Sequence, residues 1–148
     1  MINYETIKNL ADKFSDEYSY SYKDDLYDLC NKIGARILIS GLNKQQSVEN
    51  KFNIIISPFA SIQRDRIDIA SGIGLFYLGF LKQLDITYKE SYWFALNLLM
   101  PEEEFKACWL DKGLKFTMKK FDVNKQTAIT RAKMLNLDVN NIWQQQGE

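Results

Sequence analysis

The side-chain combinations that zinc binding and nucleophilic catalysis most often use are missing from this 148-residue chain. The chain contains no histidine, which removes the commonest general base and a principal zinc ligand. Its two cysteines, Cys30 and Cys108, lack the close spacing of a zinc-binding pair. Ser71 has no histidine to activate it as a nucleophile. We therefore expect no bound metal, no cofactor and no enzymatic activity.

An acidic run, Glu102–Glu104, directly follows Pro101. Proline is favoured at the first position of a helix, and acidic side chains interact favourably with the positive end of the helix dipole. No calcium-loop pattern surrounds the run. The run therefore predicts the start of a helix rather than a cation site.

Composition indicates one domain, residues 1–148, of an ordinary globular type. Apolar residues make up 46% of the chain, charged residues 26%, and the formal net charge is zero. Zero net charge provides no overall attraction to nucleic acid or to an anionic membrane. No apolar stretch reaches a membrane-spanning length, and the N-terminal residues are typical of an amphipathic helix rather than of a signal peptide. Two cysteines in apolar contexts favour buried free thiols, so we expect a cytoplasmic protein without a membrane partner.

Hydrophobic periodicity predicts an α+β fold with a helical majority and a small sheet. Two short apolar runs, residues 35–40 and 51–57, predict strands. Gly34 is placed to end the helix before the first strand, and Ser61 to cap the helix after the second. The expected helices are residues 2–14, 24–33, 62–83, 87–99, 102–111, 114–121 and 125–135. Residues 142–148 are expected to form a loose tail in which Trp143 is a candidate for docking.

The helix expected at residues 62–83 contains three glycines within eight residues, Gly72, Gly74 and Gly79. Each costs about 1 kcal/mol relative to alanine in a helix interior. One explanation is structural, because small side chains at Ala70 and Gly74 would let another helix pass close by. The other explanation is that this segment is what remains of a functional motif.

Three segments, in order along the chain, resemble the ImmA/IrrE family of zinc peptidases, which bacteria and their mobile elements encode. NIIIS followed by QRDRIDIA is similar to the family's strand and the lead into its catalytic helix. ASGIGLFYL stands where the family has A-H-E-x-G-H, and ESYWFALNLLMPEEEF is close to E-x-x-x-F-A-x-x-L-L-M-P-x-x-x-F. The resemblance covers about Asp24 to Leu137. It implies a mostly helical zincin-like domain that ends in a helix-turn-helix-like segment.

The resemblance places the family's two histidines at Ser71 and Leu75, and its glutamate at Gly72. In the family, the histidines hold one zinc ion from one helix face and the glutamate acts as the general base. Glu90 matches the third, carboxylate ligand, and one carboxylate does not hold a catalytic zinc. The resemblance thus implies the fold while the residues exclude the reaction. It makes Ser71 and Gly72 remnants of a metal site, Gly74 an inherited packing position, and Leu75 a filler of the second histidine's space.

Members of this family typically act on a repressor of a mobile element or on a partner regulator. The resemblance therefore implies a non-catalytic pseudo-peptidase that binds a phage or mobile-element repressor or another transcription factor. The expected contact surface is a groove between helices 62–83 and 87–99. Its candidate anchors are aromatic, because aromatic residues dominate interface energetics: Phe76, Tyr77, Tyr92 and Trp93. Burial in the core is the competing interpretation for each of them.

DNA binding by the basic segment 112–137 is the alternative function. Between Lys112 and Lys133, seven basic residues accompany one acidic residue, Asp122. Two helices around the turn FDVN, with Asn124 as a cap, are typical of a helix-turn-helix. The candidate contacts are Lys119, Lys120, Lys125, Gln126, Thr127, Thr130, Arg131 and Lys133. The competing interpretations are a solvated basic face, and a partner for the acidic first thirty residues of this chain or of a second copy.

Overall fold

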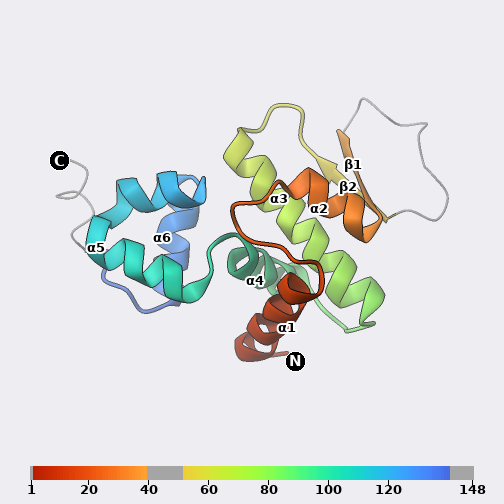
Figure 1. Cartoon of the computed structure of the whole chain (residues 1–148), viewed down its shortest axis with the longest axis horizontal. Helices are drawn as coiled ribbons and strands as arrows, with labels where there is room; N and C mark the ends of the chain where they lie inside the picture. Colours follow the sequence, from red (N-terminus) through yellow and green to blue (C-terminus); the bar gives the residue numbers. More distant parts are fainter. Residues whose placement is uncertain (1, 40–51, 141–148) are drawn as a thin grey trace.

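The computed structural model of the chain describes residues 2–39 and 52–140, and these residues form a mostly helical α+β fold (Figure 1). The elements are α1 (Tyr4–Glu17), α2 (Leu26–Ile33), β1 (Ala35–Ile39), β2 (Phe52–Ile56), α3 (Ile62–Gly74), the π-helix η1 (Leu75–Leu81), α4 (Tyr88–Leu99), α5 (Glu102–Phe121) and α6 (Lys125–Met134). The predicted helical majority and small sheet are confirmed. The expected docking of Trp143 lies outside the described residues.

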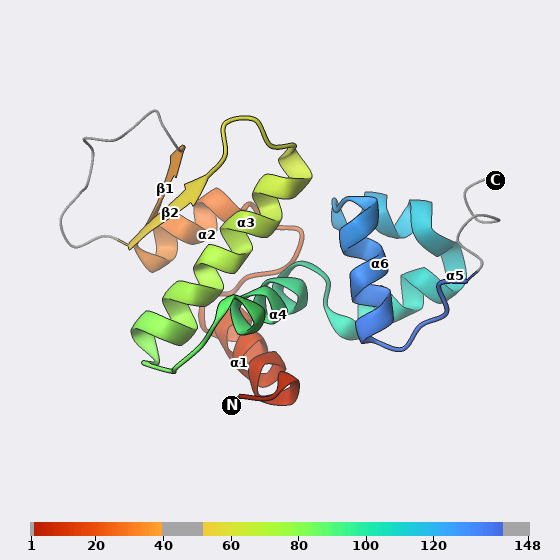
Figure 2. The ribbon, with the colours of Figure 1, turned by 180° about the vertical axis from the view of Figure 1, so that it is seen from behind.

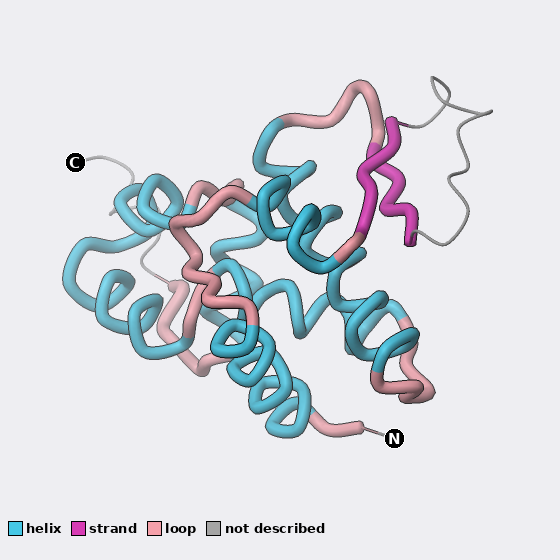
Figure 3. Tube along the Cα trace, turned by 45° about the vertical axis from the view of Figure 1, so that its right-hand side comes forward, coloured by secondary structure: helices cyan, strands magenta, loops and turns pink. Residues whose placement is uncertain are grey.

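The sheet consists, in the described residues, of two parallel strands that pair in register from Ala35 with Phe52 to Ile39 with Ile56. Both strands lie where apolar runs predicted them (Figure 3). Gly34 ends α2 in the left-handed conformation, with φ of 82°, as predicted. At the other side of the sheet, the Ser61 hydroxyl caps α3 by accepting a hydrogen bond from the Arg64 amide at 3.1 Å.

The glycines of α3 and η1 do not share one explanation. A Cβ atom on Gly74 would lie 3.0 Å from both the Phe94 ring and the Ser91 carbonyl oxygen of α4. A Cβ atom on Gly72 would lie 2.6 Å from a methyl group of Ile54 on β2. The absence of a side chain at Gly74 and Gly72 therefore lets α4 and β2 approach α3 closely. Gly79 is different, because the nearest atom to a Cβ there would be 3.6 Å away, which is an ordinary contact distance. Near Gly79 the predicted α-helix has widened into η1.

Helices α5 and α6 lie together at one end of the molecule and the sheet lies at the other (Figures 1 and 2). Element α5 is interrupted at Gly113, where φ is 79° and ψ is −168°, so the two helices predicted on either side of this residue are confirmed as its two segments. The Asn124 side chain caps α6 by accepting a hydrogen bond from the Thr127 amide at 2.8 Å, as predicted.

Aromatic rings at the centre of the core join α1, η1 and α4. Phe14, Tyr77 and Phe94 pack on one another with ring centroids 4.9 to 5.8 Å apart. Cys30 and Cys108 are both buried and form no disulfide, as predicted. Among helices of the described residues, none combines the length and apolar character needed to cross a bilayer.

Candidate functional site

A hollow of about 390 Å³ lies where β2, α3 and the first turn of α4 meet. The three positions that the resemblance assigns to the zinc site, Ser71, Gly72 and Leu75, all border it. We call it the Ser71 hollow. The residues that line it are Phe52, Asn53, Ile54, Ile55, Asp68, Ser71, Gly72, Leu75, Tyr88 and Ser91.

The Ser71 hollow runs along an edge of strand β2. Successive side chains of a strand point to opposite faces of the sheet. Four consecutive residues, 52–55, line this hollow, so the hollow must follow the edge of the strand rather than one face. Strand β1 pairs with the other edge of β2. Within the described residues no further strand pairs with the edge beside the hollow. This edge therefore offers backbone hydrogen-bonding groups to a bound chain.

Two polar atoms at the Ser71 hollow are buried without a hydrogen-bond partner in the described part of the chain. They are the hydroxyl oxygen of Ser71, whose residue is 8% exposed, and the side-chain oxygen of Asn53. A buried polar atom left unpaired costs about 1–3 kcal/mol. A bound molecule would recover that free energy where its insertion moves the surrounding side chains enough to reach these two atoms, which are buried in the free protein.

Exposed apolar side chains surround these polar atoms. Ile55 of β2 and Tyr88 of α4 are both exposed, and Leu75 is 47% exposed. The expectation that Leu75 fills the space of a histidine is therefore wrong, because it borders an open hollow instead. The combination of an open strand edge, unpaired polar atoms and an apolar rim is typical of a site that binds an extended peptide.

One carboxylate is present among the residues that line the Ser71 hollow. This carboxylate, Asp68, forms an ion pair with Arg64 at 3.2 Å. Among the residues that the structure describes, no three His, Cys, Asp or Glu side chains gather closely enough to hold a metal ion. The Ser71 hydroxyl has no hydrogen-bonded base in this part of the structure.

Glu90, at the position of the third zinc ligand, does not line the Ser71 hollow. Its carboxylate accepts hydrogen bonds from the Thr87 hydroxyl and, at 3.0 Å, from the Thr87 amide at the start of α4. The hydrogen bond from the Thr87 hydroxyl is the main cause that lowers the pKa of Glu90. Glu90 therefore caps α4 and holds its first turn.

The predicted groove between helices 62–83 and 87–99 is found in part. Helix α3 and the first turn of α4 both border the Ser71 hollow, while further along the two helices pack directly at Gly74. Phe76 and Tyr77 are buried in the structure, so their prediction as partner anchors is wrong. Tyr92 is partly exposed and stacks on Tyr88 at the rim of the hollow. Trp93, also partly exposed, packs edge-on against Tyr4 of α1.

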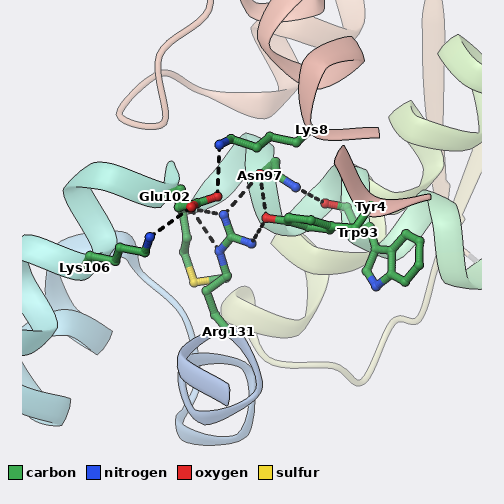
Figure 4. Close-up of polar contacts among 8 residues, drawn as sticks. Tyr4, Lys8, Trp93, Asn97, Glu102, Lys106 and Arg131 are labelled. Atoms are coloured by element: carbon green, nitrogen blue, oxygen red, sulfur yellow. Dashed lines mark hydrogen bonds and ion pairs between the residues drawn. The ribbon is translucent and has the colours of Figure 1, made fainter. Parts of the chain in front are cut away.

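Arg131 does not face a nucleic-acid groove. Its side chain is fully buried at a contact that we call the Arg131 junction, where it links α6 to α4 and α1 (Figure 4). The guanidinium donates hydrogen bonds to the Met100 carbonyl oxygen at 3.0 and 3.2 Å, to the Asn97 side-chain oxygen at 3.1 Å and to the Tyr4 hydroxyl at 2.8 Å. Beside it, Glu102 pairs with Lys8 of α1 at 3.2 Å. The prediction that Arg131 contacts DNA is therefore wrong.

The other predicted nucleic-acid contacts divide by exposure. Thr127 is buried, which contradicts its expected place in a groove, while Thr130 and Lys125 are partly exposed. The remaining four are exposed: Lys119, Lys120, Gln126 and Lys133. Lys119 and Lys125 also border a second, basic hollow of about 500 Å³ beside the start of α6.

Sequence reasoning singled out three of the ten residues that line the Ser71 hollow and missed the other seven, among them Asn53, Ile55 and Tyr88. A signal for Asn53 was present, because it is the one polar residue of the apolar strand Phe52–Ile56. Ile55 and Tyr88 give no such signal. Each has an apolar or aromatic side chain, and the sequence pattern is the same whether such a side chain is exposed or buried.

Comparisons of the chain with protein-family models, with curated proteins and with solved structures find no significant match. The resemblance to the ImmA/IrrE family therefore stays a prediction.

Proposed function

We propose that this chain is a non-catalytic, zincin-like relative of the ImmA/IrrE peptidases that binds an extended segment of a protein partner at the Ser71 hollow. One observation carries the proposal: Ser71, Gly72 and Leu75 converge on a hollow beside an edge of β2. In residues 2–39 and 52–140 no strand pairs with this edge, and two buried polar atoms there have no partner. An added strand would satisfy backbone groups of β2, and apolar side chains of the partner would cover the rim.

The partner is proposed to be a repressor of a phage or mobile element, or another transcription factor. This identity rests on the resemblance, since the family acts on such regulators. Binding without cleavage follows from the residues at the zinc positions, which supply one hydroxyl group and no imidazole. A cytoplasmic location is part of the proposal and agrees with two cysteines that form no disulfide.

Recovery of the partner from host lysate by Leu75→Glu and Leu110→Glu variants tests this function. Leu75 is 47% exposed at the hollow, whereas Leu110, on α5, is 75% exposed and does not line it. Both positions are exposed enough for a glutamate to leave the fold intact, so the two variants differ in whether the new charge lies at the hollow. We expect wild type and Leu110→Glu to recover one intact partner. Leu75→Glu should recover about tenfold less, because an unpaired charge replaces an apolar contact.

A third variant, Ser71→Glu, probes the floor of the same hollow. We expect it to weaken partner binding at least as much as Leu75→Glu does, provided that its circular dichroism matches that of the wild type. Unchanged affinity in a folded Ser71→Glu protein would remove the hollow from the proposal. Recovery of a cleaved partner would show that the site is catalytic.

DNA binding remains a second candidate because lysines gather at the basic hollow, which Lys115, Lys119 and Lys125 border beside the start of α6. Phosphate contacts by lysine make binding strongly dependent on salt. If this function holds, a duplex DNA probe should bind at low salt and dissociate at high salt. Lys119→Gln with Lys120→Gln should weaken that binding, whereas Leu75→Glu should leave it unchanged.

A further inference from the structure

The loop between α1 and α2 borders two adjoining hollows that the proposed function does not use. They measure about 410 and 460 Å³ and share Asp24 and Asp25. We call the pair the acidic hollow. The first part is closed by the first turn of α3 and by Asp122 of the turn between α5 and α6, and the second by α2 and Tyr20.

Carboxylates outnumber cations in the acidic hollow. The carboxylates are Asp24, Asp25, Asp28, Asp65 and Asp122, and the cations are Lys23, Lys32 and Arg66. Two of the cations have partners: Arg66 forms an ion pair with the Asp122 carboxylate at 3.6 Å and donates hydrogen bonds to the Phe121 and Asp122 carbonyl oxygens, and Lys32 donates one to the Tyr18 carbonyl oxygen. The surplus of negative charge favours a cationic ligand.

The two shared carboxylates are held in place by backbone amides. Asp24 accepts a hydrogen bond from the Ser21 amide at 2.8 Å, and Asp25 accepts one from the Tyr27 amide at 2.6 Å. Each bond occupies one acceptor site of a carboxylate that has about four. The aspartates are therefore oriented before any ligand arrives, and they retain capacity to accept further hydrogen bonds.

Tyr20 gives an independent indication of a ligand. Its residue is 8% exposed, it lines the hollow, and its hydroxyl has no hydrogen-bond partner in residues 2–39 and 52–140. Burial is the main cause that raises the pKa of Tyr20; the charge of Arg66 lowers it, and the charges of Asp24 and Asp25 raise it further. The Asp65 carboxylate likewise has a buried oxygen without a partner in the described chain.

We infer that the acidic hollow binds the guanidinium group of an arginine side chain on a protein partner. Guanidinium carries five donors in a planar fork, so it can meet acceptors at several points of the hollow together. An ammonium group is a compact charge and meets fewer of them. A metal ion fits poorly, because no cluster of three ligating side chains exists in the described residues. The inference is independent of binding at the Ser71 hollow.

The test is an NMR titration of the ¹⁵N-labelled full chain at low salt with N-acetyl-arginine amide. N-acetyl-citrulline amide, of the same shape without the charge, is the matched probe. We expect saturable shifts at the amides of Asp24, Asp25 and Asp28, and binding of citrulline amide about tenfold weaker.

Two substitutions locate the site. Asp25→Asn removes the charge and keeps a good helix cap, so the fold should hold while arginine-amide affinity falls about tenfold. Tyr20→Phe keeps the ring, removes the hydroxyl and should weaken binding about threefold. Asp111→Asn, an exposed carboxylate on α5 outside the hollow, is the control and should change nothing.

Equal shifts with arginine and citrulline amides would overturn the inference. The inference would also be overturned if putrescine or Mg²⁺ shifted the same amides with comparable affinity, because the hollow would then attract any cation. Shifts that map away from Asp24 and Asp25, or that persist unchanged in Asp25→Asn, would also overturn it.

Discussion

The Ser71 hollow and the Arg131 junction both bury polar side chains, but these side chains are hydrogen-bonded at the junction and unpaired at the hollow. At the junction, one guanidinium donates four hydrogen bonds to three groups: the Tyr4 hydroxyl on α1, the Asn97 side chain on α4 and the Met100 carbonyl directly after α4. At the hollow, the Ser71 hydroxyl and the Asn53 side-chain oxygen have no partner among the described residues. A satisfied buried network holds helices together, whereas unsatisfied groups beside an open hollow are available to a ligand. The contrast separates a region built for stability from one suited to binding.

Arg131→Met should produce the largest effect, because it removes all four hydrogen bonds of the junction. The Met100 carbonyl, the Asn97 side chain and the Tyr4 hydroxyl would be left buried without this donor. We expect the free energy of unfolding to fall by about 3 kcal/mol, measured by urea denaturation. Lys133→Met, an exposed change on the same helix, should stay within about 0.5 kcal/mol of wild type. Equal losses in both variants would contradict the assigned role of the junction.

Gly74→Ala should have the next largest effect. Its new Cβ atom would lie 3.0 Å from Phe94 and from a backbone carbonyl oxygen, so α3 and α4 would have to separate. We expect a loss of about 1–2 kcal/mol in unfolding free energy, since overpacking outweighs the gain in helix propensity. Gly79→Ala, with its nearest neighbour at 3.6 Å, should be neutral or slightly stabilising. If Gly79→Ala unfolded at a lower urea concentration than Gly74→Ala, the packing explanation would be refuted.

Ser71→Ala should leave stability unchanged or raise it by about 1 kcal/mol. The hydroxyl is buried without a partner in the described structure, so its removal costs no hydrogen bond. The same variant should bind the partner more weakly, because a bound segment would hydrogen-bond to this group. A loss of stability in Ser71→Ala would instead mean that the hydroxyl is bonded in the free protein.

Glu90→Gln should have a small effect that depends on pH. Hydrogen bonds from Thr87 lower the pKa of Glu90 below its ordinary value of 4.5, so the folded state favours the ionised form. This stabilisation is present above about pH 4.5 and is lost as the pH falls through the lowered pKa. The difference between wild type and Glu90→Gln in unfolding free energy should therefore shrink between pH 7 and pH 3. A constant difference over this range would exclude the capping role.

Local signals predicted most of the fold. Gly34, Ser61 and Asn124 each perform the capping role that their residue types indicate, and Gly113 interrupts α5 where the pattern separated two helices. The widening into η1 was not predicted. Apolar residues that follow one another along Leu75–Leu81 fit an α-helix and a π-helix equally well.

The candidate site was predicted in part. Ser71, Gly72 and Leu75 were singled out correctly as neighbours, because they are close in sequence on one helix. The burial of Arg131 was missed, and that of Phe76 was weighed only as the competing interpretation. Both depend on elements distant in sequence: α1 and α4 for Arg131, and Phe52 of β2 for Phe76. The hollow was expected between two helices; α3 and the first turn of α4 do border it, and the edge of β2, which was not predicted to line it, forms its remaining wall.

Photo-crosslinking in the native host tests the central claim most directly. A photoreactive amino acid replaces Leu75 at the Ser71 hollow in one protein and Leu110 on α5 in the other. We predict one adduct with a single intact protein from position 75, and its absence from position 110. A cleaved partner at position 75, or the same adduct from both positions, would contradict a non-catalytic binding site at the Ser71 hollow.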